Sequence, residues 1–125
     1  MATDLQLPII CSLSVIAGTD LGKIFTLYGR VIIVGRSEHA DFQINEIAAA
    51  PRQFEMRWSP EKYSYQIKHI GGVNDVILNN LPLKFGQEAE LNDNDHISIG
   101  GTVLLYKFTI DIAMAISNAI ASTWK

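Results

Sequence analysis

Hydrophobic and polar side chains alternate with a period of two along most of the chain. The clearest run covers residues 53–58. Phe54, Met56 and Trp58 fall on one face of this run, and Gln53, Glu55 and Arg57 fall on the other. A period of two is that of a half-buried β-strand. We therefore expect a strand whose Phe54 face is buried and whose Glu55 and Arg57 side chains are exposed.

Similar patterns predict further strands. They lie at residues 9–16, 23–28, 31–34, 63–68, 76–78, 81–83, 97–99 and 103–108, with another short strand after the acidic turn that follows Arg36. Residues 31–34 are all apolar, as in a strand buried on both faces. Asn79-Asn80 tolerates positive φ and suits a two-residue hairpin. About ten or eleven short strands, with turn signals between them, predict an all-β antiparallel sandwich.

The end of the chain has a different period. Residues 110–124 place Ile112, Ala115, Ile116, Ala119 and Ile120 on one side of a predicted α-helix. We thus expect a sandwich domain over residues 1–109 and a C-terminal helix over 110–125. The apolar arc is wider than one contact with the sandwich requires. We predict that the helix mediates an oligomer or contacts a larger complex; packing on the sandwich is the alternative.

The composition suits one folded domain. The chain has 125 residues, of which 48% are hydrophobic and 18% charged, with a net charge of −3. This excludes an intrinsically disordered chain. It also argues against a nucleic-acid partner, because such binding depends on clustered lysine and arginine.

Cysteine content and the N-terminus bear on location. Cys11 is the only cysteine, so no intrachain disulfide can form. Asp4 lies where a signal peptide would carry basic residues, and no apolar stretch approaches the roughly 20 residues of a membrane span. We expect a cytoplasmic location and no direct membrane span.

The sequence carries little enzymatic chemistry. His39, His69 and His96 have no spacing typical of a metal site. Asp93 and Asp95 lie in a turn, where carboxylates bond backbone amides. No nucleophile elbow or phosphate-binding glycine motif occurs. We expect no enzyme activity, no metal site and no cofactor.

Two arginines stand out as candidate binding residues. Gly35-Arg36-Ser37 ends one predicted strand, Pro51-Arg52 precedes another, and residues 72–75 join two more. Because loops at one end of a sandwich converge, Arg36, Ser37, Arg52 and Asn74 could surround one anion. Arginine binds phosphate through two parallel charge-assisted bonds. The alternative, that the arginines pair with Glu38, Asp41 or Glu55, is equally compatible with the spacing.

These motifs together resemble the forkhead-associated (FHA) domain. The resemblance extends over residues 9–108. It rests on AGTDLGKIFTL, VGRS, ADFQI, HIGGVNDVILNN and LNDNDHISIG, in this order and spacing. It implies a β-sandwich that recognises phosphothreonine peptides through Arg36, Ser37, Arg52 and Asn74.

The sequence also departs from the family pattern. Pro51 replaces a serine that bonds the phosphate, and Phe54 replaces a histidine that braces the loop. Asp75 adds a negative charge beside the candidate anion site. We therefore expect a non-enzymatic interaction or scaffold module whose phosphothreonine dependence is weakened or lost. A working phosphothreonine reader in signalling is the alternative. The family also fits a larger assembly, such as a bacterial secretion apparatus.

Overall fold

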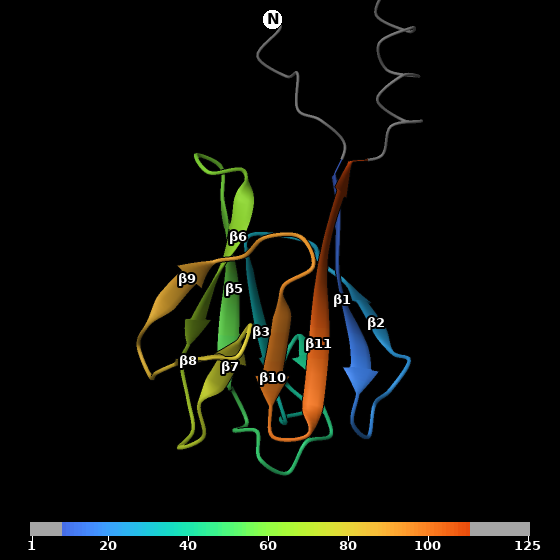
Figure 1. Cartoon of the computed structure of the whole chain (residues 1–125), viewed down its shortest axis with the longest axis vertical. Helices are drawn as coiled ribbons and strands as arrows, with labels where there is room; N and C mark the ends of the chain where they lie inside the picture. Colours follow the sequence, from blue (N-terminus) through green and yellow to red (C-terminus); the bar gives the residue numbers. More distant parts are fainter. Residues whose placement is uncertain (1–8, 111–125) are drawn as a thin grey trace, which may run out of the picture.

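The computed structural model describes residues 9–110, which form eleven β-strands (Figure 1). The strands are β1 (Ile9–Ala17), β2 (Ile24–Thr26), β3 (Val31–Gly35), β4 (Phe42–Gln43), β5 (Phe54–Ser59), β6 (Ser64–His69), β7 (Val76–Leu78), β8 (Leu81–Leu83), β9 (Glu88–Glu90), β10 (His96–Ile99) and β11 (Thr102–Ile110). The predicted β-sandwich and its strand number are confirmed.

The strands form two sheets. One has the order β2-β1-β11-β10-β7-β8 and the other β4-β3-β5-β6-β9. β1 and β11 pair along most of their length, with Ile9 opposite Ile110, so the two ends of the described chain lie side by side (Figure 1). One pair departs from the antiparallel expectation: β3 and β4 run parallel, with Val34 opposite Phe42.

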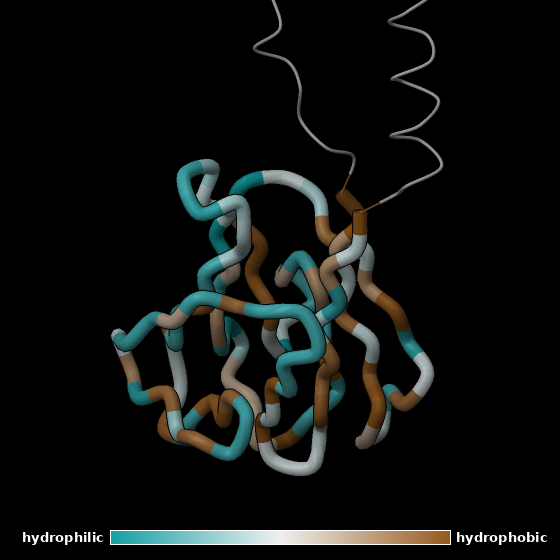
Figure 2. The backbone as a smooth tube through the Cα atoms, turned by 45° about the horizontal axis from the view of Figure 1, so that its top comes forward, coloured by the Kyte–Doolittle hydropathy of each residue, from teal (hydrophilic) through white to brown (hydrophobic). Residues whose placement is uncertain are grey.

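The core lies between the inward faces of the two sheets. It is built from alternate strand residues, including Leu13, Phe54, Met56, Ile67 and Leu104, each fully buried. Burial of such side chains contributes about 1.5–3 kcal/mol each relative to exposure. Figure 2 shows hydrophobic stretches along the strands and hydrophilic stretches in many of the connecting loops.

Several local predictions can be compared directly with the structure. Asn79 and Asn80 both adopt positive φ, 50° and 69°, in the tight β7–β8 hairpin. Arg57 is exposed, as expected, but Glu55 and Trp58 are both half-buried, so these two expectations are wrong. Val31, by contrast, is 41% exposed, so the expectation that residues 31–34 are buried on both faces is wrong. The reason is that β3 alternates like the other strands: Ile32 and Val34 point into the core, whereas Val31 and Ile33 lie on the opposite face and are less buried.

The predicted C-terminal helix requires a correction. Its expected start, Ile110, is the last residue of β11 and pairs with Ile9, so the strand ladder continues where the helix was expected to begin. Residues 9–110 contain no helix, and hence none that could cross a membrane. Over residues 9–110 the fold is therefore a sandwich of eleven strands with no helix, and the predicted start of the helix at Ile110 is wrong. The rest of that prediction, including the intermolecular contact, concerns residues 111–125, which lie outside the described residues.

Strand direction determines which loops meet. β3 ends at Gly35, β5 begins at Phe54 and β6 ends at His69, and β5 is antiparallel to both β3 and β6. The chain after β3, before β5 and after β6 therefore lies at the same end of this sheet. The β5–β6 turn and the start of β3 lie at the opposite end (Figure 1).

Candidate functional site

Three loops meet at one end of the sandwich, and two glycines allow their close approach. We call residues 36–41, 44–53 and 70–75 the loop cluster. A Cβ on Gly35, just before the first loop, would lie 2.1 Å from the Pro51 carbonyl oxygen. One on Gly71 would lie 2.2 Å from the Arg52 carbonyl oxygen. Only glycine permits backbones this close, so the three loops interlock.

Hydrogen bonds join the loops at residues 48–51. The Arg36 amide donates to the Ala50 carbonyl over 2.9 Å, and the Ser37 amide donates to the Pro51 carbonyl over 3.1 Å. From the third loop, Asn74 Nδ2 donates to the Ala48 carbonyl over 2.8 Å. The structure thus brings Arg36, Ser37, Arg52 and Asn74 to one surface on a connected backbone.

The two arginines of the loop cluster keep their charge available. Both are exposed, and Arg36 Nε donates to the Ala49 carbonyl over 3.1 Å. Neither makes an ion pair with any residue in 9–110.

The acids considered as their partners have other contacts. Glu55 pairs with Arg57 at 3.1 Å, and Glu38 lies 3.7 Å from His39. Asp41 Oδ2 accepts a bond from the Ile33 amide over 2.7 Å. The alternative that internal ion pairs explain the two arginines is therefore wrong for the described chain.

The carboxylate of Asp75 is neutralised locally. Its Oδ2 lies 2.7 Å from Lys84 Nζ. Asp75 is half-buried, so this ion pair is less screened than a fully exposed one. The repulsion that the sequence predicts between Asp75 and a bound anion is consequently reduced.

The hydroxyl donors of the loop cluster are few. Ser37 Oγ accepts a bond from the His39 amide over 3.0 Å, which leaves its O–H able to donate. Pro51 offers neither a side-chain donor nor an amide hydrogen.

Two exposed aliphatic side chains also belong to the loop cluster. Val73 is 98% exposed and Ile47 is 91% exposed, the two highest values among the exposed large hydrophobics of the described chain. The rim of the site therefore combines guanidinium groups that make no ion pair within residues 9–110 with aliphatic side chains.

Gln53 braces the loop cluster, and its role was missed by the sequence pattern. Alternation placed it on the face opposite Phe54, yet it is fully buried. Its Oε1 accepts a bond from the Ala50 amide over 2.7 Å, and its Nε2 donates to the Asn74 carbonyl over 3.0 Å. Gln53 precedes β5, so the alternation of the strand does not extend to it.

His69 supports the same bracing network from β6. It is also buried, with Nε2 2.7 Å from the Gly71 carbonyl oxygen and Nδ1 2.9 Å from the Leu83 carbonyl oxygen. Gln53 and His69 together hold the second and third loops, the role that the resemblance assigns to a histidine at the position of Phe54. Phe54 itself is a core residue.

We expect Gln53→Ala to lower the free energy of unfolding by about 2 kcal/mol. The substitution removes a fully buried side chain and leaves the partly buried Ala50 amide and the Asn74 carbonyl without their bonds, and an unsatisfied buried polar group costs about 1–3 kcal/mol. Urea denaturation measures the change. Gln43→Ala is the control, because Gln43 is exposed and makes a single side-chain bond to the Arg36 carbonyl. A Gln53→Ala protein as stable as the control would show that Gln53 does not brace the loops.

Glu46 ties the second loop to the other sheet. Its Oε2 accepts a bond from the Ala48 amide over 3.1 Å, and its Oε1 accepts one from the Thr102 hydroxyl over 2.8 Å. These bonds, that from Ala48 first, lower the pKa of the Glu46 carboxyl. The anchored carboxylate thus positions Ala48, the acceptor for Asn74.

The remaining polar candidates form no second site of this kind. His39 and His96 are exposed, and Cys11 is buried in the core. Within residues 9–110, no group of three or more histidine, cysteine, aspartate or glutamate side chains could hold a metal ion.

Comparison with solved structures identifies the fold. The chain is similar to the FHA domain of a hypothetical protein from Arabidopsis thaliana (22% identity, 82% of this chain and 87% of that one, TM-score 0.74). It is similar to the FHA domain of the CT664 protein from Chlamydia trachomatis (23%, 78% and 96%, 0.70). The N-terminal FHA domain of Rad53p from S. cerevisiae, solved with a phosphothreonine peptide, is a third (17%, 86% and 98%, 0.67).

The sequence leads to the same family. No curated protein matches the chain significantly. The model of the FHA domain matches residues 32–100, more than half of the chain, from β3 to the β10–β11 turn. This range contains all three loops of the cluster. The chain therefore belongs to the FHA domain family, whose members are phosphopeptide-binding protein interaction modules.

Proposed function

We propose that this protein is a non-enzymatic interaction module that docks an anionic segment of a partner protein on its loop cluster. Arg36 and Arg52 supply the charge, and Ser37 and Asn74 supply polar contacts. The observation that carries the proposal is the pair of exposed guanidinium groups without ion pairs in residues 9–110, held on loops that are bonded to each other. A fixed, unpaired guanidinium favours a carboxylate or phosphate ligand.

We further propose that dependence on phosphothreonine is weakened. Pro51 and Val73 provide no hydroxyl. A tetrahedral phosphate group would therefore depend on donors from the two arginines and Ser37, which are too few to satisfy all its oxygens. A charge-assisted bond contributes about 1.5–3 kcal/mol, so each missing donor lowers affinity by about tenfold or more. A planar carboxylate needs fewer donors than a phosphate group. The affinities of the site for acidic and for phosphorylated segments should therefore be closer to each other than in a dedicated phosphothreonine reader.

A phosphothreonine reader is the second candidate. The observation in its favour is the Asp75–Lys84 ion pair, which removes much of the repulsion expected beside the site. Similar solved structures include an FHA domain described as phosphothreonine-dependent in its interactions.

Titration with matched peptides separates the two candidates. Three peptides would differ at one position, carrying threonine, phosphothreonine or glutamate, and calorimetry would measure the dissociation constants. Weakened dependence predicts that phosphothreonine and glutamate bind within about tenfold of each other, whereas a reader predicts a preference of about 100-fold or more for phosphothreonine. Absence of binding by all three peptides across a varied flanking library would contradict both candidates.

Arg36→Gln tests the site itself. We expect it to lower the affinity for the tighter peptide by about tenfold, because one charge-assisted contact is lost. Arg57→Gln is the matched control, since Arg57 is exposed but paired with Glu55 on β5. An equal loss in both variants would show that general charge, not the loop cluster, carries the binding.

The wider setting follows from the same proposal. A module with one anion-binding face suits a scaffold role, and a place in a larger bacterial assembly such as a secretion apparatus stays a prediction. A cytoplasmic location also stays a prediction. Co-purification of the full chain from its native cell would identify the partner.

A further inference from the structure

A pocket at the other end of the sandwich is independent of the loop cluster. Arg30 lies just before β3, Trp58 near the end of β5 and Tyr65 near the start of β6, and all three line it. Arg30 and Arg36 bracket the five-residue strand β3, so they are about 20 Å apart along it. One ligand group cannot contact both arginines.

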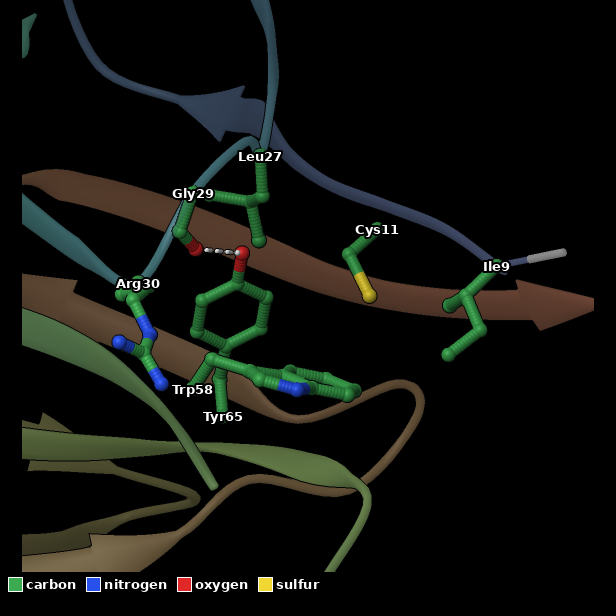
Figure 3. Close-up of a pocket in the computed structure, with 7 residues that line it drawn as sticks. All are labelled: Ile9, Cys11, Leu27, Gly29, Arg30, Trp58 and Tyr65. Carbon is green, nitrogen blue, oxygen red and sulfur yellow. Dashed lines mark hydrogen bonds between the residues drawn. The ribbon is translucent and has the colours of Figure 1, made fainter. Parts of the chain in front are cut away.

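The pocket is lined chiefly by apolar and aromatic groups. Its volume is about 320 Å³. The lining residues are Ile9, Cys11, Leu27, Gly29, Arg30, Trp58 and Tyr65. Figure 3 shows Arg30 and Ile9 towards opposite ends, with Cys11 and the rings of Trp58 and Tyr65 between them. Ligand pockets have volumes from about 300 Å³ upwards, so this one has room for one bulky group but not for an extended segment.

Two polar groups of the pocket wall, the Tyr65 hydroxyl and the Cys11 thiol, already contact other groups of the protein. The Tyr65 hydroxyl donates to the Gly29 carbonyl over 2.9 Å (Figure 3). Cys11 Sγ lies 3.7 Å from the Tyr106 hydroxyl. Burial raises the pKa of Tyr65 to about 12 and also raises the pKa of the Cys11 thiol, so both groups stay neutral at neutral pH. The pocket wall between Ile9 and Arg30 is therefore uncharged.

Arg30 is the one charged residue in this lining. Its side chain is exposed and makes no hydrogen bond or ion pair with residues 9–110. An unpaired guanidinium beside an apolar pocket selects a ligand that carries both an apolar body and a negative group. A cationic or purely polar ligand would gain nothing from this arrangement.

We propose that this pocket binds a partner protein segment in which a bulky apolar side chain stands next to a carboxylate. The apolar side chain enters between Leu27, Trp58 and Tyr65, and the carboxylate pairs with Arg30. A C-terminal leucine or phenylalanine has this chemistry, as has an apolar residue beside aspartate or glutamate. The module would then contact its partner at two separated points.

Binding of a minimal probe tests the pocket in the full chain. N-acetyl-phenylalanine carries the apolar group and the carboxylate, and its carboxamide lacks only the charge. The signal is the ¹⁵N-labelled indole Nε1–H of Trp58, distinguished from that of Trp124 by the Trp124→Phe variant. A ligand of this size should bind with a Kd of about 1 mM. We expect a saturable shift of the Trp58 signal, with the acid binding about threefold to tenfold more tightly than the carboxamide.

Two arginine variants distinguish this site from the loop cluster. Arg30→Gln should abolish the preference for the acid, and its thermal melt should not change because Arg30 is exposed and has no side-chain bond within residues 9–110. Arg36→Gln, at the other end, should leave the preference intact. Equal binding of acid and carboxamide, an unchanged preference in Arg30→Gln, or no saturable Trp58 shift would each overturn the proposal. None of these outcomes depends on whether the loop cluster binds phosphopeptides.

Discussion

Phe54→Ala is expected to destabilise the protein by about 3–5 kcal/mol, the range measured when a buried aromatic side chain is truncated. Phe54 is fully buried between the sheets, so removing its ring leaves a cavity that neighbouring strands cannot close. The family resemblance assigns a bracing histidine to this position, whereas here the side chain belongs to the core. Guanidinium denaturation with the slope compared between variants would measure the loss.

Tyr28→Ala is the control for this truncation. Tyr28 is also aromatic but is 78% exposed, and its loss should change stability by no more than about 0.5 kcal/mol. If Phe54→Ala were as mild as Tyr28→Ala, the packing of β5 against the opposite sheet would be wrong.

Gly35→Ala is expected to remove about 3 kcal/mol of stability and to weaken binding at the loop cluster. The new methyl group would lie 2.1 Å from the Pro51 carbonyl oxygen, and this contact is with backbone, which cannot rotate away. The second loop must then move, and the bonds from the Arg36 and Ser37 amides to residues 50 and 51 lengthen or break. Denaturation measures the stability, and the peptide titration measures the affinity.

Gly101→Ala is a matched control for Gly35→Ala. A Cβ on Gly101 would meet its nearest neighbour, Glu46 Oε1, at 3.8 Å, which is ordinary van der Waals contact. We expect a change of about 0.5 kcal/mol or less there. A Gly35→Ala protein that retained wild-type stability and affinity would show that the close approach of β3 to Pro51 is unnecessary for the site.

The sequence by itself determined most of the strands and the class of fold, although β9 (Glu88–Glu90) was not predicted. Alternation is a local property, because side chains of a strand point to opposite faces whatever the strand pairs with. Turns such as Asn79-Asn80 are equally local, since positive φ depends on the residue type and its neighbours. Phe54 and Met56 were therefore assigned to the core correctly from their spacing alone.

The predicted helix shows where local periodicity fails. The helical pattern was extended back to Ile110, but this residue pairs with Ile9, about a hundred positions away in the sequence. A partner strand provides hydrogen bonds that local propensity cannot foresee. The boundary of β11 was thus decided by tertiary pairing.

Only the tertiary structure decided what surrounds the candidate site. Gln53 is polar and precedes a strand, so the sequence does not predict its burial. Its side chain is buried because it bonds the Ala50 amide and the Asn74 carbonyl. Asp75 is a similar case. The sequence does not reveal that its carboxylate forms an ion pair with Lys84, whose Nζ lies 2.7 Å away. The sequence shows which residues have side chains that can bind an anion. Distances between separate loops determine which charges remain unpaired, and those distances depend on how both sheets pack.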